Sequence, residues 1–208
     1  MKSIKSLLTY SFLLITIAMY SQDFPYETYK SSKVTYLGLD YTQARFVDDV
    51  AFVSAEELST KFFKTWNRML VTEPDKYDFK KFTDKANAII DLSIMDERNS
   101  KIDPSNIIQN DFFDLKQSEI PQIVRSMDFG DLDGLVAFFI VGTYNKNAAL
   151  ASYFLVLFDV DQVEILYTKK YTSKPAGFGF KNYWARTYYE VLLQVEKDNK
   201  KKWSKGKN

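Results

Sequence analysis

Residues 134–172 read "GLVAFFIVGTYNKNAALASYFLVLFDVDQVEILYTKKYT" and decide the fold. Three apolar runs follow one another here, separated only by the short polar turns "NKN" at 145–147 and "DVDQ" at 159–162. Runs joined so closely pair as neighbouring antiparallel strands. The first two runs are apolar at successive positions, so we expect both of their faces to be covered in the centre of a sheet.

The flanking sequence supplies helices. "SAEE" at 54–57 is a capping box, with Ser54 as N-cap and Glu57 reaching back, and apolar residues follow it at helical spacing. After "GFGF" at 177–180, apolar residues recur at helical spacing again, which predicts a final helix. Further elements are expected as a strand from residue 33, a short helix near 79–82, a strand at 88–96 and a helix at 118–127.

These elements predict an α/β protein of the α+β type. A chain of 208 residues fits one domain. We expect a mixed or mostly antiparallel sheet with helices packed on it, and a C-terminal β-meander followed by a helix. No internal repeat and no second domain are predicted.

The N-terminus predicts export. Residues 1–21 combine Lys2 and Lys5 with an uncharged run from Leu7 to Tyr20, which is too short to cross a bilayer and is typical of a signal peptide. The sequence contains no cysteine, so a lipid anchor through cysteine is excluded. We expect a periplasmic or extracellular protein without a transmembrane span in its mature part.

The charge is divided along the chain. Residues 197–208 hold six lysines and one aspartate, whereas residues 22–196 hold 20 basic and 26 acidic residues. We therefore predict a single domain over 22–196 and a basic disordered tail over 197–208. Such a tail makes weak contact with anionic surfaces or serves only solubility. Nucleic acid is not an expected partner.

The absence of histidine narrows the chemistry. With neither His nor Cys, catalytic triads, histidine bases and ordinary zinc sites are excluded. Any chemistry would have to use carboxylates, lysines, tyrosines or an oxygen-bound metal. We predict a protein that is not an enzyme, with no catalytic residue, no metal site and no cofactor.

The stretch "GFGFKN" at 177–182 follows a strand and opens a helix, where a dinucleotide-binding loop would lie. The third glycine of that fingerprint is Asn182 here, and too little chain remains for a nucleotide-binding unit. Two interpretations of this stretch remain open. The helix start binds an anion, with Lys181 nearby, or the glycines provide a turn that places Phe178 and Phe180 in separate pockets.

Aromatic and basic residues at the start of the final helix give the best interaction hypothesis. Tyr and Arg concentrate at binding hot spots. Tyr183 and Tyr189 lie partly off the apolar stripe of the helix, so some aromatic surface is expected to face solvent. The predicted binding residues are Lys181, Asn182, Tyr183, Arg186 and Tyr189.

The segments "GLVAFFIVGTYNK", "ASYFLVLFDV" and "GFGFKNYWA" resemble a family of exported, uncharacterised proteins of Bacteroidetes-type bacteria. The order of strands and helices is also similar to the periplasmic part of the curli secretion channel and to the N-terminal part of TolB. The resemblance implies a small α/β envelope module and brings no catalytic residues. Many relatives are lipoproteins, and the missing cysteine departs from that pattern.

Two functions remain as the main hypotheses, beside weak binding of anionic surfaces by the lysine-rich tail. The first is an exported, non-enzymatic module that binds an envelope protein or a surface polymer through the final helix. The second is a small-ligand or anion binder, or a carboxylate-dependent enzyme, with its site at the start of that helix. The second predicts a pocket that unites Lys181, Asn182 and acidic residues.

Overall fold

A seven-stranded sheet organises the structure, a computed structural model that describes residues 24–48 and 52–205. Its longest strands are β5 (Leu135–Asn145), β6 (Leu150–Asp159) and β7 (Glu164–Ser173). They pair in antiparallel order, β5 with β6 and β6 with β7. The predicted meander is confirmed, and β5 is buried along its whole length, as expected of a central strand.

The other edge of β5 pairs in parallel with two shorter strands that lie end to end. β1 (Val34–Asp40) pairs with the first part of β5, and β2 (Arg45–Val47) with its end. β3 (Ile89–Ile90) extends the sheet beyond β1, and β4 (Ile108–Gln109) extends it beyond β2, both in parallel. The sheet is mixed, as predicted, because the meander is antiparallel and these four pairings are parallel.

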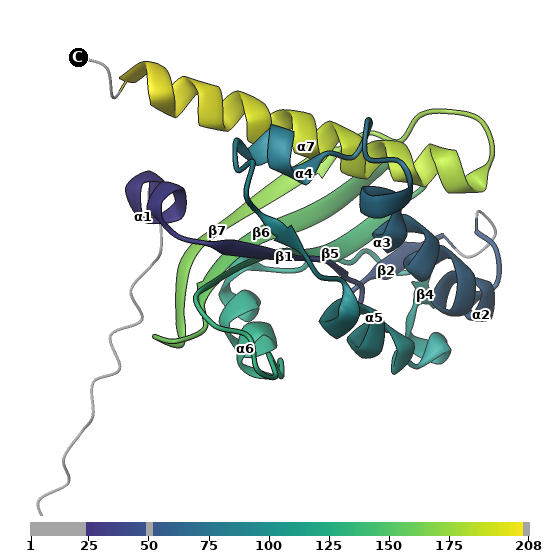
Figure 1. Cartoon of the computed structure of the whole chain (residues 1–208). Helices are drawn as coiled ribbons and strands as arrows, with labels where there is room; N and C mark the ends of the chain where they lie inside the picture. The colour runs from purple at the N-terminus through teal and green to yellow at the C-terminus, as the bar shows by residue number, and fades with distance from the viewer. Residues whose placement is uncertain (1–23, 49–51, 206–208) are drawn as a thin grey trace, which may run out of the picture.

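Helices cover both faces of the sheet (Figure 1). The core on one face takes residues from α1, α3, α4 and α7, and the core on the other face takes residues from α5 and α6. Their bounds are α1 (Tyr26–Ser31), α2 (Ala55–Glu57), the π-helical η2 (Leu58–Phe62), α3 (Phe63–Thr72), α4 (Phe79–Thr83), α5 (Ser93–Ser100), the 3-10 turns η3 (Pro104–Asn106) and η4 (Gln117–Glu119), α6 (Ile120–Arg125) and α7 (Phe180–Lys205).

The alternation of β5 explains the two cores. Successive side chains of a strand point to opposite faces of the sheet. Accordingly Leu135, Ala137, Phe139 and Val141 belong to the core under α7, and Val136, Phe138 and Ile140 belong to the core over α6. Since both cores share one sheet, the described chain is a single α/β domain.

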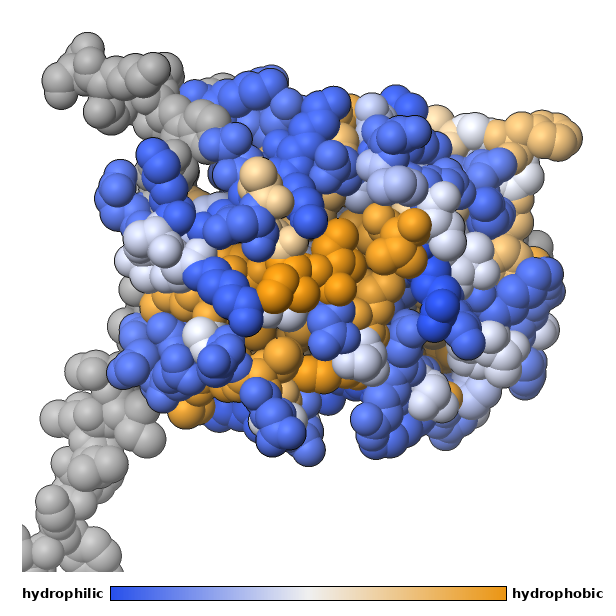
Figure 2. Space-filling view, viewed as in Figure 1, coloured by the Kyte–Doolittle hydropathy of each residue, from blue (hydrophilic) through white to orange (hydrophobic). Residues whose placement is uncertain are grey.

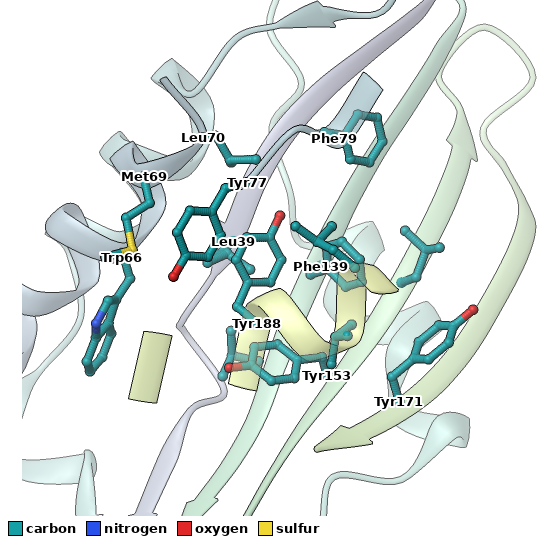
Figure 3. Close-up of a cluster of buried hydrophobic side chains, with 14 of the residues drawn as sticks. Leu39, Trp66, Met69, Leu70, Tyr77, Phe79, Phe139, Tyr153, Tyr171 and Tyr188 are labelled. Atoms are coloured by element: carbon teal, nitrogen blue, oxygen red, sulfur yellow. The ribbon is translucent and has the colours of Figure 1, made fainter. Parts of the chain in front are cut away.

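Buried tyrosines fasten α7 to the sheet, and Figure 3 shows part of this core. The hydroxyls of Tyr36 and Tyr188 lie 2.6 Å apart, as do those of Tyr153 and Thr187. Burial raises the pKa of Tyr36 and Tyr188 well above the usual value, so both phenols are protonated at neutral pH. Their hydrogen bonds therefore satisfy polar groups in a core that excludes water.

Two local predictions differ from the structure. The expected strand at 88–96 is limited to Ile89 and Ile90, because the Asp91 carboxylate accepts hydrogen bonds from the backbone N–H and hydroxyl of Ser93 and turns the chain into α5. The stretch before residue 32 contains α1, where no helix was predicted. The cap at Ser54 is confirmed, since its hydroxyl accepts the N–H of Glu57 at 3.1 Å.

The end of the chain also differs from expectation. A disordered tail was predicted from residue 197, but α7 continues through Lys205. Asp198 explains part of this difference, because its carboxylate binds Lys169 at 2.5 Å and the hydroxyl of Tyr171 at 3.0 Å, both on β7. The predicted signal segment, 1–21, lies outside the described residues. In the described ranges, no helix has the length and apolar character needed to cross a bilayer.

Apolar atoms gather in the middle of the face between α4 and α5 (Figure 2). The exposed apolar residues of the described chain include Val71 and Ile89, which are 51% and 44% exposed. Ile89 belongs to β3, which forms an outer edge of the sheet. A strand of two residues offers little backbone for pairing with another chain, and short edge strands limit such association.

Candidate functional site

The loop between β7 and α7 is shaped by its glycines. Gly177 and Gly179 have φ angles of +113° and +77°, a region that favours glycine. The loop projects beside the start of α7 (Figure 1). Phe178 at its tip is 95% exposed, so the expectation that Phe178 occupies a pocket is wrong. Phe180 is half-buried and packs against the core, with its ring centroid 4.8 Å from that of Phe62.

Lys181 and Asn182 do not form one site. The backbone carbonyl of Lys181 accepts the indole N–H of Trp66 at 3.0 Å, and its ammonium group lies 3.4 Å from the carboxylate of Glu73. Asn182 is exposed, and its amide donates to the carbonyl of Phe178 at 3.4 Å. Lys181 therefore ties α7 to α3, whereas Asn182 supports the loop.

The aromatic residues of α7 lie mostly in the core. Trp184 and Tyr188 are buried. Tyr183 and Tyr189 are half-buried, and Tyr189 makes edge contacts with the rings of Tyr77 and Phe82. The exposed aromatic surface on the described part of this helix is thus small, and Phe178, in the loop before it, is almost fully exposed.

Cations cover the two half-buried tyrosines. The ammonium group of Lys146 lies 3.9 Å from the ring centroid of Tyr183. The guanidinium of Arg186 lies 4.9 Å from the ring centroid of Tyr189 and also pairs with Glu190. Cation–π contacts of this kind stabilise partly desolvated rings.

A cavity of about 510 Å³ lies between the loop and α7. Asn182 and Arg186 line it, as predicted binding residues, together with Lys76, Lys174 and Glu190. In the described part of the chain, neither Lys76 nor Lys174 has a carboxylate within ion-pair distance. The charged residues of the described lining are thus three cations and one anion, which favours an anionic ligand.

The cavity differs from the predicted pocket. Lys181 does not line it, and it contains one acidic residue where several were expected. The sequence patterns did not single out Lys76 or Lys174. Lys76 lies between α3 and α4, far from the loop in sequence, and only the folded structure brings it to this cavity. Within the described residues, no three acidic side chains converge to hold a metal ion. The geometry supports binding of anions, and no catalytic grouping is assigned.

Comparison with known proteins gives only distant likenesses. No protein-family model matches the sequence, and no curated protein matches it. A PelC dodecamer from Paraburkholderia phytofirmans is 10% identical over 80% of this chain and 86% of that chain, with a TM-score of 0.30. Lipoprotein GNA1162 from Neisseria meningitidis is 11% identical over 78% and 95%, with a TM-score of 0.33.

The C-terminal domain of LpoB from Salmonella enterica is 11% identical over 70% of this chain and 84% of that chain, with a TM-score of 0.28. Likenesses at this level transfer no role, location or partner to this chain. The resemblance to exported Bacteroidetes-type proteins accordingly stays a prediction from sequence.

Proposed function

We propose that this chain is an exported, non-enzymatic module that binds an acidic segment of an envelope protein at the cavity between the β7–α7 loop and α7. One observation carries the proposal. Lys76, Lys174 and Arg186 line the cavity, Glu190 is the one acidic residue of its described lining, and Phe178 stands 95% exposed beside it.

The cations of the cavity and the exposed Phe178 contribute to binding in different ways. Lys76 and Lys174, which have no ion-pair partner among the described residues, attract carboxylates and speed encounter with an acidic partner. An exposed phenylalanine supplies apolar area that becomes buried on binding, worth about 2 kcal/mol when it is fully covered. Because α7 is fixed to the sheet by buried contacts, Arg186 is held on a rigid element, while Lys76 and Lys174 come from the turn after α3 and from the loop before α7.

Export and the choice of an envelope partner rest on the sequence. The N-terminal segment 1–21 has the composition of a signal peptide, and the chain has no cysteine for a lipid anchor. A mature protein of this kind meets envelope proteins and surface polymers, both of which carry carboxylates. The surface polymer is therefore the alternative occupant of the same cavity.

Site-specific photo-crosslinking tests the proposal. A benzophenone amino acid replaces Phe178 in one variant and Val163 in a control, since Val163 is also exposed, at 75%, but lies in the β6–β7 turn. After irradiation of intact producing cells, we expect a discrete protein adduct at 178 and none at 163. Mass spectrometry of the adduct should place the crosslink in an acidic segment.

A charge-reversal variant tests the role of the cations in the same crosslinking experiment. Lys174→Glu is an exposed change that reverses one cation of the cavity. It should reduce the adduct at 178 about tenfold, because it removes an attraction and adds a repulsion. The same adducts at both positions, or an adduct unaffected by Lys174→Glu, would contradict the proposal. A polysaccharide adduct would instead identify a surface polymer.

A small anion is a second candidate for the cavity. Its volume lies within the ~300–1,000 Å³ of typical ligand pockets. Citrate should then raise the melting temperature of the wild type more than that of Lys174→Glu. An equal rise in the two proteins would exclude this candidate.

A further inference from the structure

A second cavity, of about 590 Å³, lies beyond the carboxyl end of β1, on a part of the molecule that the proposed function does not use. Thr42, Arg98 and Ser126 line it, and they come from the residues after β1, from α5 and from the end of α6. Ligands of sheets with parallel strands usually bind beyond the carboxyl ends of those strands. The cavity therefore has both the size and the position of a ligand site.

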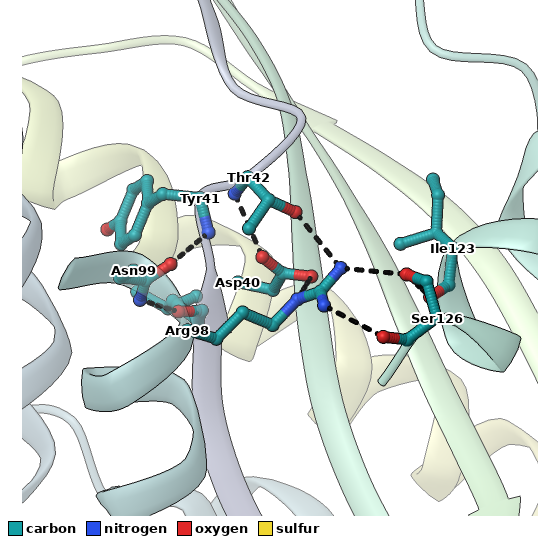
Figure 4. A network of polar contacts seen from close by, with 8 residues as sticks. Asp40, Tyr41, Thr42, Arg98, Asn99, Ile123 and Ser126 are labelled. Carbon is teal, nitrogen blue, oxygen red and sulfur yellow. Dashed lines mark hydrogen bonds and ion pairs between the residues drawn. The ribbon is translucent and has the colours of Figure 1, made fainter. Parts of the chain in front are cut away.

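A buried carboxylate fixes the guanidinium at this cavity (Figure 4). Asp40, the last residue of β1, has a fully buried side chain, and one of its oxygens accepts Nε–H of Arg98 at 3.0 Å. Its other oxygen accepts the backbone N–H of Thr42 at 2.8 Å. Because both oxygens of Asp40 are used, Arg98 is held in one orientation.

The outer nitrogens of Arg98 are less firmly bound. Nη2 lies 3.4 Å from Oγ1 of Thr42 and 3.3 Å from Oγ of Ser126, and Nη1 lies 3.5 Å from the carbonyl of Ser126. These distances exceed the usual ~2.9 Å of an N–H···O bond. A carboxylate in the cavity would make shorter hydrogen bonds to the Nη groups and would also accept from the hydroxyl of Thr42, whereas the hydroxyl of Ser126 already donates to the carbonyl of Ile123 at 2.7 Å.

The contacts of Arg98 with Thr42 and Ser126 are not needed to hold α5 against β1. The Asp40–Arg98 pair would pin α5 to β1 without Thr42 or Ser126, and Asn99 already joins these elements by accepting the N–H of Tyr41 at 2.8 Å. Arg45 adds a second guanidinium to the lining, half-buried and without a carboxylate within ion-pair distance in the described ranges. Two guanidinium groups thus border one cavity.

Acidic residues line the same cavity, which sets it apart from a simple anion site. Asp128 uses Oδ1 to accept the N–H of Gly130 at 2.9 Å, and its side chain is exposed. Asp103 accepts the N–H of Ser105, and Glu97 pairs with Lys101. Asp128 is therefore the carboxylate with most capacity left for an ammonium group.

We propose that this cavity binds a small zwitterion of amino-acid or dipeptide size. The ligand's carboxylate lies against Arg98, Thr42 and Ser126, and its ammonium group lies against Asp128. Ile94 and Ile102, which also line the cavity, provide an apolar wall for a side chain. A ligand with both charges suits this lining better than an anion, because cations and acids occur in equal number among the described residues that line the cavity.

Isothermal titration calorimetry tests the proposal with defined probes. The wild type is titrated with each of the standard L-amino acids and with glycylglycine, and with acetate and methylamine as probes that carry one charge each. We expect at least one zwitterion to bind with Kd below about 1 mM. Acetate and methylamine should bind at least about tenfold more weakly, since each lacks half of the contacts.

Three variants locate the site. Asp128→Asn and Thr42→Val alter the lining while leaving the Asp40–Arg98 pair intact, and each is checked for folding by circular dichroism. At least one of them should weaken zwitterion binding about tenfold or more. Lys174→Glu changes the other cavity and should leave this affinity unchanged, so failure here is distinct from failure of the proposed function.

Three results would overturn the proposal. They are no binding of any zwitterion to the folded wild type, acetate binding as tightly as the best zwitterion, and full affinity in both Asp128→Asn and Thr42→Val.

Discussion

Gly38 is the residue whose identity the fold constrains most directly. It has a φ of +95° inside β1, where the pairing with β5 shifts register between Tyr36 and Leu39. A Cβ at this position would stand 2.1 Å from Oδ1 of Asn67. That same oxygen accepts the N–H of Leu39 at 2.9 Å. The glycine thus permits the strand to bulge and lets a helix side chain satisfy the freed backbone group.

Gly38→Ala should therefore be strongly destabilising. We expect a loss of about 3 kcal/mol in the free energy of unfolding, from left-handed backbone strain and from displacement of the Asn67 amide. Urea unfolding of both proteins measures the difference. Gly130→Ala is the matched control, because Gly130 also has positive φ, +56°, but no atom lies within 4 Å of the added Cβ.

Gly130→Ala should reduce the free energy of unfolding by only about 1 kcal/mol, because it adds backbone strain without a steric clash. Equal losses at Gly38 and Gly130 would show that contact with Asn67 contributes nothing.

The candidate site could be predicted residue by residue only in part. Asn182 and Arg186 were predicted, since both belong to the conspicuous run that opens α7, and both line the first cavity. Lys76 and Lys174 carry no local pattern. The packing of the loop against α7 brings Lys174 to that cavity, and the position of the turn after α3 brings Lys76 there. The pairing of Asp40 with Arg98 spans β1 and α5 and likewise has no signal in sequence spacing.

Among the elements, β7 is joined to the segment before α6 by charge. Asp114 lies between Lys116 and Lys170, and its carboxylate binds both ammonium groups. Partial burial acts to raise the pKa of Asp114, but hydrogen bonds from Lys170 and Lys116 outweigh burial and hold it below the ordinary value of 3.8. A depressed pKa means that the ionised carboxylate stabilises the fold.

This stabilisation should depend on pH. It is complete above the unfolded pKa near 3.8 and is lost as the pH falls through the lower pKa of the folded state. Asp114→Asn should therefore reduce the free energy of unfolding by up to about 1 kcal/mol at pH 7, and the difference from wild type should shrink below about pH 4. Denaturant unfolding at a series of pH values measures it.

Asp111→Asn serves as the control for this change. Asp111 is exposed and belongs to the same segment, and no ion pair involves it in the described ranges. The free energy of unfolding of Asp111→Asn should stay close to that of the wild type at every pH of the series. A constant deficit of Asp114→Asn across the whole pH range would indicate lost packing instead of lost charge.

Elements with strong periodicity were predictable, and elements held by tertiary contacts were not. The meander and the helix after Ser54 follow from continuous apolar runs, a clear cap and helical spacing. The α5 segment has no apolar stripe, and its helix is stabilised by contacts of Arg98 and Asn99 with the end of β1. β2 and β4 are so short that their pairing partners, not their sequences, define them.

In the whole molecule, α7 closes one face of the sheet from end to end. Its first turn binds α3 through Trp66 and Lys181, and the hydroxyls of Tyr188 and Thr187 bind the sheet in its middle. Near its end, Asn199 donates to the carbonyl of Phe82 at 3.3 Å. A helix anchored at three places explains why α7 continues past residue 197.

Truncation separates the structural part of this C-terminal region from its lysine-rich remainder. Removing 197–208 also removes Asp198 and its bonds to Lys169 and Tyr171. We expect a loss of about 1–2 kcal/mol and a fall of a few degrees in melting temperature. Removing only 201–208 leaves Asp198 in place and should leave the melting temperature within about one degree of the full chain.

The shorter truncation is also the proper test of the anionic-surface hypothesis. It removes Lys201, Lys202, Lys205 and Lys207 without disturbing the contacts of Asp198. If these lysines bind anionic surfaces, sedimentation with anionic vesicles at low salt should fall in the shorter truncation while its melting temperature stays that of the full chain. Equal melting temperatures for both truncations would show that the Asp198 contacts do not hold the end of α7.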